Sequence, residues 1–227
     1  MRAIRTVILA AASLALAGVL SACATVPKTK DYTAFHAENP RSILVVPTLN
    51  NTLNVEAPDF FLSTISRPFG ERGYYIFPAY MVKRLLEEDG LSDAGLVHNV
   101  DARRLDRLFG CDAVLFITIQ QWDSKYVVLA TQTTVSFDYA LKSCKTGEFL
   151  WQDTEKMVYS PQQNNSSGNP LADLVAQAIL AALEKAAPNY MPLAIQANVA
   201  AASTPGRGLP AGPYLPGQYQ KDRKLFP

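Results

Sequence analysis

Apolar and polar positions alternate in blocks along the first half of the chain, and the blocks change between strand and helix spacing. Residues 42–47 are a continuous β-branched apolar run ended by Pro47, as expected of a buried strand. Pro58 suits the first turn of the helix that follows, and Gly110 suits the position just after a helix. The predicted order is strand, helix, strand, helix and helix, over residues 42–47, 58–70, 74–77, 81–89 and 101–109.

The pattern changes after Gly110 to long β-rich runs over 113–122, 126–141 and 149–159. Alternation of apolar and polar residues in the first of these is typical of a strand with one buried face. Asp123, Ser124 and Lys125 are placed at the tip of a hairpin, where a partner could contact them, although a solvated turn is the simpler interpretation. We therefore predict a three-stranded antiparallel meander.

The last third of the chain is predicted as a polar loop, a helix and a tail. The loop covers 162–169, and Asn169 and Pro170 can begin an amphipathic helix that ends near Pro188. From residue 196 onward, Ala, Pro and Gly predominate, so we expect an extended tail. The predicted fold class is α/β: a βαβα unit, a three-stranded antiparallel meander and a C-terminal helix, forming a mixed sheet with packed helices and an extended Pro/Gly tail.

Composition places the chain among globular proteins. It has 227 residues, of which 48% are hydrophobic and 18% charged, with a net charge of +1. This length favours one domain with appendages. Near-neutral charge gives no electrostatic reason to expect a nucleic-acid partner.

The amino terminus combines Arg2 and Arg5 with an apolar run that is too short to span a membrane as a mature helix, followed by small residues up to Ala22. Leu20-Ser-Ala-Cys23 resembles the lipobox of bacterial lipoproteins, which implies acylation of the Cys23 thiol. Ala24 after this cysteine points to the outer membrane by resemblance to the sorting rule of these proteins. The predicted organisation is a signal peptide over 1–22, a lipidated tether over 23–40, one α/β domain over 41–195 and a tail over 196–227.

Two cysteines remain beyond the anchor, Cys111 and Cys144. An even pair in an oxidising compartment is a disulfide candidate. A hairpin centred on Ser124 would instead place Cys111 opposite Asp138, about six residues from Cys144, which is too far for a disulfide unless the chain folds back. Both the disulfide and two separate thiols stay open.

Catalytic and metal-binding motifs are missing from the sequence. The two histidines, His36 and His98, fall in the predicted tether and in a loop. No His, Cys or acidic cluster has the spacing of a metal site, and no Gly-x-Ser-x-Gly elbow or phosphate-binding Gly-rich loop occurs. We therefore expect no enzyme activity, no metal and no cofactor.

The tail carries the remaining candidate binding residues, Pro213, Tyr214, Pro216 and Tyr219. Proline preforms an extended backbone and tyrosine adds apolar area with a hydroxyl, so this segment could dock into a groove on another protein. A disordered end, or a segment that wraps its own domain, is an equally good interpretation.

Taken together, these segments resemble a family of bacterial outer-membrane lipoproteins without an assigned activity, related in fold to the amino-terminal domain of TolB. The resemblance rests on the residues 20–23, 42–47, 113–119, 122, 125–128, 146–151 and 208–214. It implies companions similar to the lipoprotein of the curli secretion channel. It offers no catalytic residues, and Cys111 and Cys144 lie outside its usual pattern.

The leading hypothesis is a non-enzymatic accessory or assembly subunit of a periplasmic envelope complex, with a secretion-channel-like lipoprotein as a possible partner. It is anchored to the outer membrane by acyl chains and faces the periplasm. The alternative is a periplasmic binding module for a small molecule, peptide or glycan, which requires a pocket with convergent polar groups. A hydrolase would need one of the two histidines or an unusual pair of carboxylates.

Overall fold

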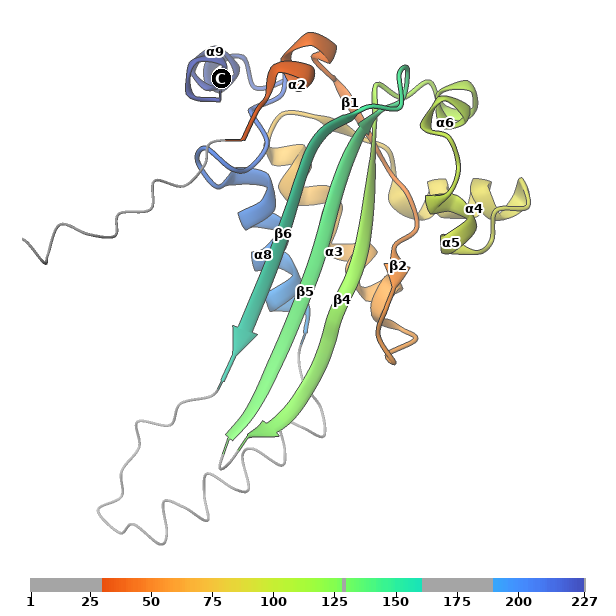
Figure 1. Cartoon of the computed structure of the whole chain (residues 1–227), viewed down its shortest axis with the longest axis vertical. Coiled ribbons are helices and arrows are strands. Elements are labelled where there is room, and N and C mark those ends of the chain that lie inside the picture. The colour runs from red at the N-terminus through yellow and green to blue at the C-terminus, as the bar shows by residue number, and fades with distance from the viewer. Residues whose placement is uncertain (1–29, 128–129, 161–189, 227) are drawn as a thin grey trace, which may run out of the picture.

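The computed structural model describes residues 30–127, 130–160 and 190–226 (Figure 1). Its strands are β1 (Ser42–Val45), β2 (Leu49–Asn50), β3 (Tyr75–Ile76), β4 (Ala113–Val127), β5 (Ala130–Ser143) and β6 (Phe149–Tyr159). Its helices are α2 (Thr33–Glu38), α3 (Ala57–Glu71), α4 (Ala79–Glu88), α5 (Ala94–His98), α6 (Ala102–Phe109), α8 (Met191–Ser203) and α9 (Pro216–Leu225).

One mixed sheet organises the described part of the chain, with strand order β3-β1-β4-β5-β6 and β2 paired to β4 further along. β1 pairs in parallel with β3 and β4, and β4, β5 and β6 pair in antiparallel fashion. The predicted meander and the mixed α/β class are therefore confirmed. Pro58 lies in the first turn of α3, and Gly110 adopts the left-handed conformation after α6, both as predicted.

The hairpin between β4 and β5 turns later than predicted. Residues 123–125 are not its tip, because β4 continues through them to Val127 and Lys125 pairs with Gln132. The polar side chains of Asp123 and Lys125 form an ion pair at 2.8 Å on the strand, so their polarity marks an exposed strand face. Consequently Thr118, not Cys111, is opposite Asp138.

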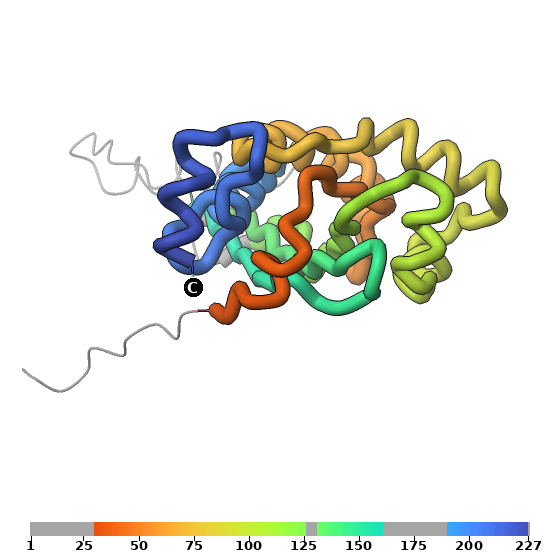
Figure 2. Tube along the Cα trace, turned by 90° about the horizontal axis from the view of Figure 1, so that it is seen from above, coloured from red at the N-terminus to blue at the C-terminus, as the bar shows by residue number. Residues whose placement is uncertain are grey.

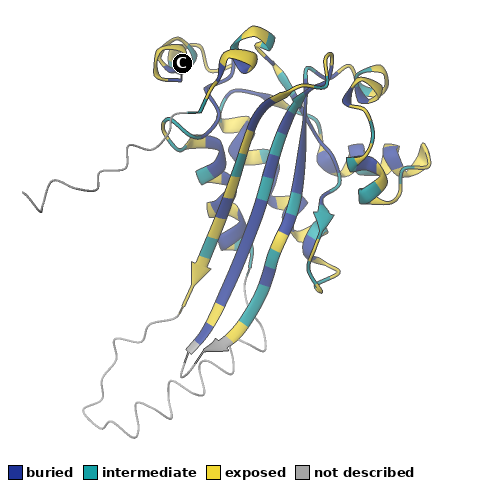
Figure 3. Cartoon of the chain, in the orientation of Figure 1, coloured by how far each residue is buried: buried dark blue, intermediate teal, exposed yellow. Residues whose placement is uncertain are grey.

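Helices cover the two sheet faces unequally (Figures 1 and 3). On one face, which we call the inner face, α3 and α8 pack on the sheet through residues such as Ile65, Ala197 and Phe137. On the opposite, outer face, α4, α5 and α6 bury residues such as Leu86 and Leu105 against β1 and β4. No described helix covers the whole length of β5 and β6 on the outer face.

The expectation of an extended tail over 196–227 is wrong. Residues 191–203 form α8, whose buried alanines lie in the core, and the predicted boundary at 195/196 falls inside this helix. Alanine is the best helix former, and Pro192 is tolerated in the first turn. Residues 207–215, here called the strap, then cross the domain to α9, with Leu209 fully buried. Pro210 and Pro213 lie in the strap, and Pro192 and Pro216 lie in the first turns of α8 and α9.

The predicted tether over 23–40 is likewise corrected for its described part. Residues 33–38 form α2, and Tyr32 and Phe35 are buried in the core. Tyr32 donates a hydrogen bond to the carbonyl of Gly208 at 2.6 Å, and its ring packs edge-on against Phe226 at 5.1 Å. The polar residues around these two aromatics suggested a tether, although the segment packs on the domain.

Several predicted features lie outside the described residues: the signal peptide, Cys23, the loop at 162–169 and the helix from Pro170 to Pro188. Within the described ranges, none of the helices is long and apolar enough to span a membrane.

Candidate functional site

A row of hydrogen-bonded polar side chains crosses the outer face of the meander. Asn51 Nδ2 donates to Gln120 Oε1 at 3.1 Å, and Gln120 Nε2 donates to Asp138 Oδ2 at 2.6 Å. From the edge strand, Thr154 Oγ1 donates to the other carboxylate oxygen, Asp138 Oδ1, at 2.7 Å. This polar ladder (Asn51, Gln120, Asp138 and Thr154) joins the segment after β2 to β4, β5 and β6. It presents an organised polar surface where no described helix covers the sheet.

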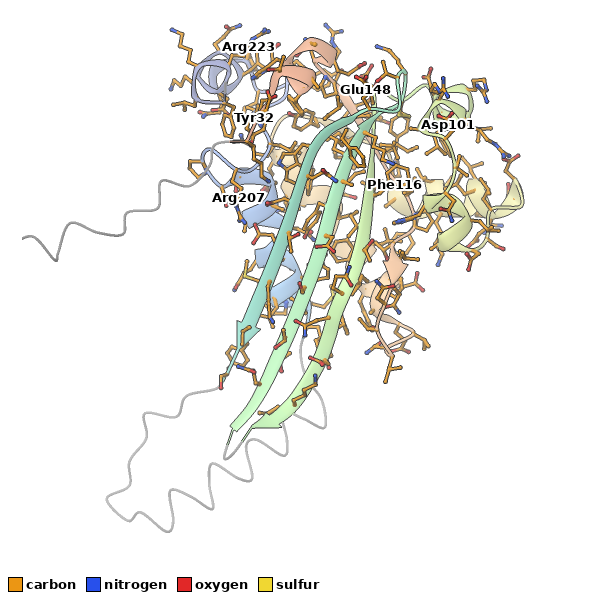
Figure 4. All side chains as sticks on the ribbon, in the orientation of Figure 1. Tyr32, Asp101, Phe116, Glu148, Arg207 and Arg223 are labelled. Carbon is orange, nitrogen blue, oxygen red and sulfur yellow. A yellow bond between two sulfur atoms is a disulfide. The ribbon has the colours of Figure 1, made fainter. Side chains whose placement is uncertain are left out.

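An open groove of about 640 Å³ lies beside the polar ladder. Its floor is the outer side of β4 and β5, and its ends are formed by α5 and by the start of β6. The lining includes His98, Phe116, Asp138, Lys142, Phe149 and Gln152. Figure 4 shows Phe116 on β4, with its side chain among those that line this face.

Lys142 places a positive charge between two aromatic rings of the groove. Its Nζ lies 5.2 Å from the ring centroid of Phe116 and 4.6 Å from that of Phe149. Aromatic faces attract a cation, so both rings favour this position of the ammonium group. The groove thus combines a fixed cation, the Asp138 carboxylate and two apolar rings.

His98 closes one end of the groove. Its ring packs edge-on against Phe116 at 5.2 Å, and Nε2 lies 3.0 Å from the carbonyl oxygen of Pro47. Burial lowers the pKa of His98 below 6.5 and the Lys142 charge lowers it further, while the Pro47 carbonyl opposes both. The imidazole is therefore neutral at pH 7, with Nε2–H donating to Pro47.

A rigid loop with exposed apolar side chains adjoins the other end of the polar ladder. The Asn50 carboxamide accepts from the backbone N–H of Thr52 at 3.1 Å and donates to the carbonyl of Asn54 at 2.8 Å. Between these anchoring bonds, Leu53 and Val55 are 101% and 88% exposed. We call residues 51–56 the apolar loop. Burying such side chains is worth about 1.5–3 kcal/mol each, so the loop has unused binding energy.

The two cysteines come together in the structure. Cys111 and Cys144 form a disulfide with a Cα–Cα distance of 5.9 Å. Ala113 pairs with Ser143 in the β4–β5 ladder, so the cysteines stand just beyond the paired ends of these strands. The bond closes the hairpin end that is opposite to its turn, and both cysteines pack in the same buried cluster as Phe116.

The tail residues expected to bind a partner differ in their exposure and contacts. The strap wraps its own domain, because Gly212 N–H donates to Arg72 and Tyr214 N–H donates to Gly73. Tyr219 donates to Asn39 Oδ1 at 2.7 Å. Tyr214 and Pro216 are exposed, whereas Pro213 is half-buried. Partner binding by these residues stays a prediction.

Both histidines are held by backbone carbonyls. His36 Nε2 bonds to the carbonyl of Phe226, and His98 bonds to Pro47, as described above. His36 therefore belongs to a packed helix and His98 to the end of α5, not to a tether and a loop. Over the described ranges, no group of three or more His, Cys, Asp or Glu residues could hold a metal ion.

Sequence reasoning missed both the groove and the apolar loop. The signal for the loop was present in Asn50-Asn51-Thr-Leu-Asn54, where side chains that form local turns flank an apolar residue. The groove had no such signal, because His98, Phe116 and Lys142 meet only through the fold.

The comparisons with known proteins agree with this architecture. Residues 30–214 match the GNA1162-like lipoprotein family. The chain belongs to this family. A GNA1162-like relative, the lipoprotein NMB1124/NMB1162 of Neisseria meningitidis serogroup B, is 38% identical over 170 residues, which are 73% of this chain and 78% of the relative. The family resemblance expected from the sequence is thereby confirmed, and membership of a lipoprotein family implies a membrane anchor.

A solved structure of a relative has the same fold. The crystal structure of lipoprotein GNA1162 from Neisseria meningitidis has a TM-score of 0.52 and 33% identity, covering 63% of this chain and 98% of that chain. A PelC variant from Paraburkholderia phytofirmans is more distant, with a TM-score of 0.43 and 13% identity over 71% of this chain and 85% of that chain.

Proposed function

We propose that this GNA1162-like lipoprotein is a non-enzymatic accessory subunit of an envelope complex. In this proposal, acyl chains on Cys23 hold it in the outer membrane with the domain facing the periplasm. Family membership supports the anchor, and Ala24 after Cys23 supports the outer membrane as its location. Two or three acyl chains hold a protein much more firmly than one.

The apolar loop is the observation that carries the proposal. A flexible loop could fold its leucine back onto the domain, but here side-chain hydrogen bonds from Asn50 and Thr52 fix the turn and hold Leu53 in water. Preformed apolar projections lose little conformational entropy when they enter a pocket. The fitting partner is a protein with an apolar pocket that receives Leu53 and Val55, flanked by polar groups that meet the polar ladder.

The environment of the histidines supports a non-enzymatic role. Both rings lie against backbone carbonyls, and the groove beside His98 is lined by Asp138 but by no serine or cysteine that could act as its nucleophile. The Asp138 carboxylate accepts from Gln120 and Thr154, so it is engaged in the polar ladder.

The test is site-specific photo-crosslinking in native membranes. A photoreactive residue at Leu53 should capture one envelope protein, and Leu53→Ser/Val55→Ser should abolish co-purification of that same protein. The matched control is Leu96→Ser/Val158→Ser, which removes two other exposed apolar side chains and should leave co-purification intact. Equal crosslinking from positions 53 and 96, or retained co-purification in the loop variant, would overturn the proposal.

The groove favours a second candidate function, a binding module for an anionic small molecule, peptide or glycan. Lys142 offers a charge between two rings, and Asp138 and Gln152 offer polar groups beside it. A ligand of this groove should raise the melting temperature of the wild type and not that of Lys142→Gln. A screen of envelope components without any shift would count against this function.

A further inference from the structure

The exposed side of α9 is strongly basic. Lys221, Arg223 and Lys224 are all exposed, and we call them the α9 cation face. Asp222 and Phe226, on the opposite side of the helix, are buried. Asp222 is the sole acid in the sequence of α9 and is engaged by Arg72, so it leaves the three cations uncompensated on their own helix.

Two exposed apolar side chains lie at the ends of α9. Tyr214, two residues before the helix, is 64% exposed, and Leu225 in its last turn is 62% exposed. Cations next to exposed Tyr and Leu are the combination found at the surfaces of membranes, where ammonium and guanidinium groups meet phosphates and the apolar groups enter the interface.

The α9 cation face lies at the end of the molecule where the chain leaves toward Cys23. α2 packs directly on α9, since Tyr219 bonds to Asn39 and Tyr32 packs on Phe226. Figures 1 and 2 show both helices at this end, and Figure 4 labels Arg223 and Tyr32 there. Lys30 is fixed to Asp153 at 2.7 Å.

Lys30 lies seven positions after Cys23, with six residues between them. Even fully extended, this segment spans only about 25 Å. A lipid anchor at Cys23 therefore holds this end of the domain within that distance of the headgroups, and the local concentration of lipid phosphate near α9 is high without any further affinity.

We propose that the α9 cation face binds the anionic headgroups of the membrane in which the protein is anchored. This inference rests on the lipid anchor of the proposed function. Each Lys or Arg near an anionic surface adds to the attraction, which falls off within a Debye length of the surface. The contact fixes an orientation: α9 and α2 lie on the membrane, and the far end of the paired strands β4 and β5, opposite to these helices in Figure 1, points away from it.

Depth-dependent quenching tests the orientation with the lipidated full-length protein. A fluorophore is attached at Gln220→Cys on α9, or at Gln132→Cys near the hairpin turn, and the protein is reconstituted into vesicles of phosphatidylglycerol and phosphatidylcholine that carry a headgroup quencher. We expect at least a fivefold larger quenching constant at position 220 than at position 132. In Lys221→Gln/Arg223→Gln/Lys224→Gln, and in vesicles of phosphatidylcholine alone, the signal at 220 should fall severalfold.

The control variant Arg67→Gln/Arg84→Gln/Lys125→Gln removes the same charge from exposed cations on α3, α4 and β4 and should leave quenching at 220 unchanged. Equal quenching at the two positions, an unaffected triple α9 variant, or protection of position 220 by an added envelope protein in place of lipid would overturn the inference.

Vesicle flotation separates the two proposals. A wild type that does not float contradicts the anchor, whereas one that floats without quenching at 220 contradicts only the contact of α9.

Discussion

Arg72 and Asp222, 150 positions apart, form an ion pair with 2.6 Å between Nη2 and Oδ2. The Asp222 side chain is 2% exposed and that of Arg72 is 15% exposed. Arg72 also donates to the carbonyl of Leu209, and Asp222 accepts from the backbone N–H of Ala211 at 2.8 Å. One pair of charges thus joins the end of α3, the strap and α9.

Asp222→Ala should therefore destabilise the domain strongly. Removing one partner of a buried pair leaves the other charge unpaired, which typically costs about 3–5 kcal/mol. The free energy of unfolding from urea titration measures the loss. Glu71→Ala, which removes an exposed acid from the pair with Arg67, is the control and should change stability little. Equal effects of the two variants would contradict a structural role for the Arg72–Asp222 pair.

The disulfide should contribute substantially to stability, since it closes a separation of 33 residues. A cross-link over that length restricts the unfolded chain by about 3–4 kcal/mol in the loop-entropy treatment. We expect Cys111→Ala/Cys144→Ala to lose this amount in urea unfolding, with the sheet signal in circular dichroism retained at low urea. If a reductant lowers the stability of the double variant as much as that of the wild type, the effect does not arise from this bond.

His98 should make stability depend on pH. Burial and Lys142 depress its folded pKa below the ordinary 6.5, so the unfolded chain takes up a proton first as the pH falls. Stability is complete above pH 6.5 and decreases below it toward the folded pKa, with a slope of at most about 1.4 kcal/mol per pH unit for one group.

His98→Gln keeps a donor for the Pro47 carbonyl and removes the titration. Urea unfolding at about pH 7 and about pH 5 should therefore show a smaller loss of stability for this variant than for the wild type. An identical pH dependence of the two proteins would assign the slope to other groups.

A buried polar network should fix α8 against α3 and the sheet. Tyr139 OH donates to Asn198 Oδ1, and Asn198 Nδ2 donates to Thr64 Oγ1, both at 2.8 Å. Asn198→Ala leaves two buried polar groups without this partner, and each such group costs about 1–3 kcal/mol. A double-mutant cycle with Tyr139→Phe should show coupling, because both residues belong to one network. Additive losses would show that the residues act independently.

Local signals predicted most of the elements up to β6. Pro58, Gly110 and the apolar spacing near them act over a few residues, so α3 and α6 could be located from sequence alone. The same local reasoning failed at residues 123–125, where an exposed strand face and a turn have similar composition. This error shifted the predicted register of β4 against β5. Cys111 then lay too far from Cys144 for a disulfide, although the two are bonded in the structure.

The C-terminal region could not be predicted because its conformation depends on distant partners. Pro210 and Gly212 are typical of an irregular chain, but the Pro210 carbonyl accepts from Tyr74 and the Gly212 amide donates to the Arg72 carbonyl, so distant residues hold the strap in place. The candidate site could not be predicted for the same reason. His98, Phe116 and Lys142 come from three elements, and no sequence spacing brings them together.

The packing of Tyr32 on Gly208 and Phe226 imposes an order on biogenesis. A chain is made and exported amino end first. Tyr32 therefore crosses the membrane before Gly208 and Phe226, the residues that it packs on. Tyr32 therefore stays exposed until α9 and Phe226 have emerged. A chain truncated before α9 lacks Phe226 and therefore leaves one side of the Tyr32 ring uncovered, where proteases and chaperones can act on it.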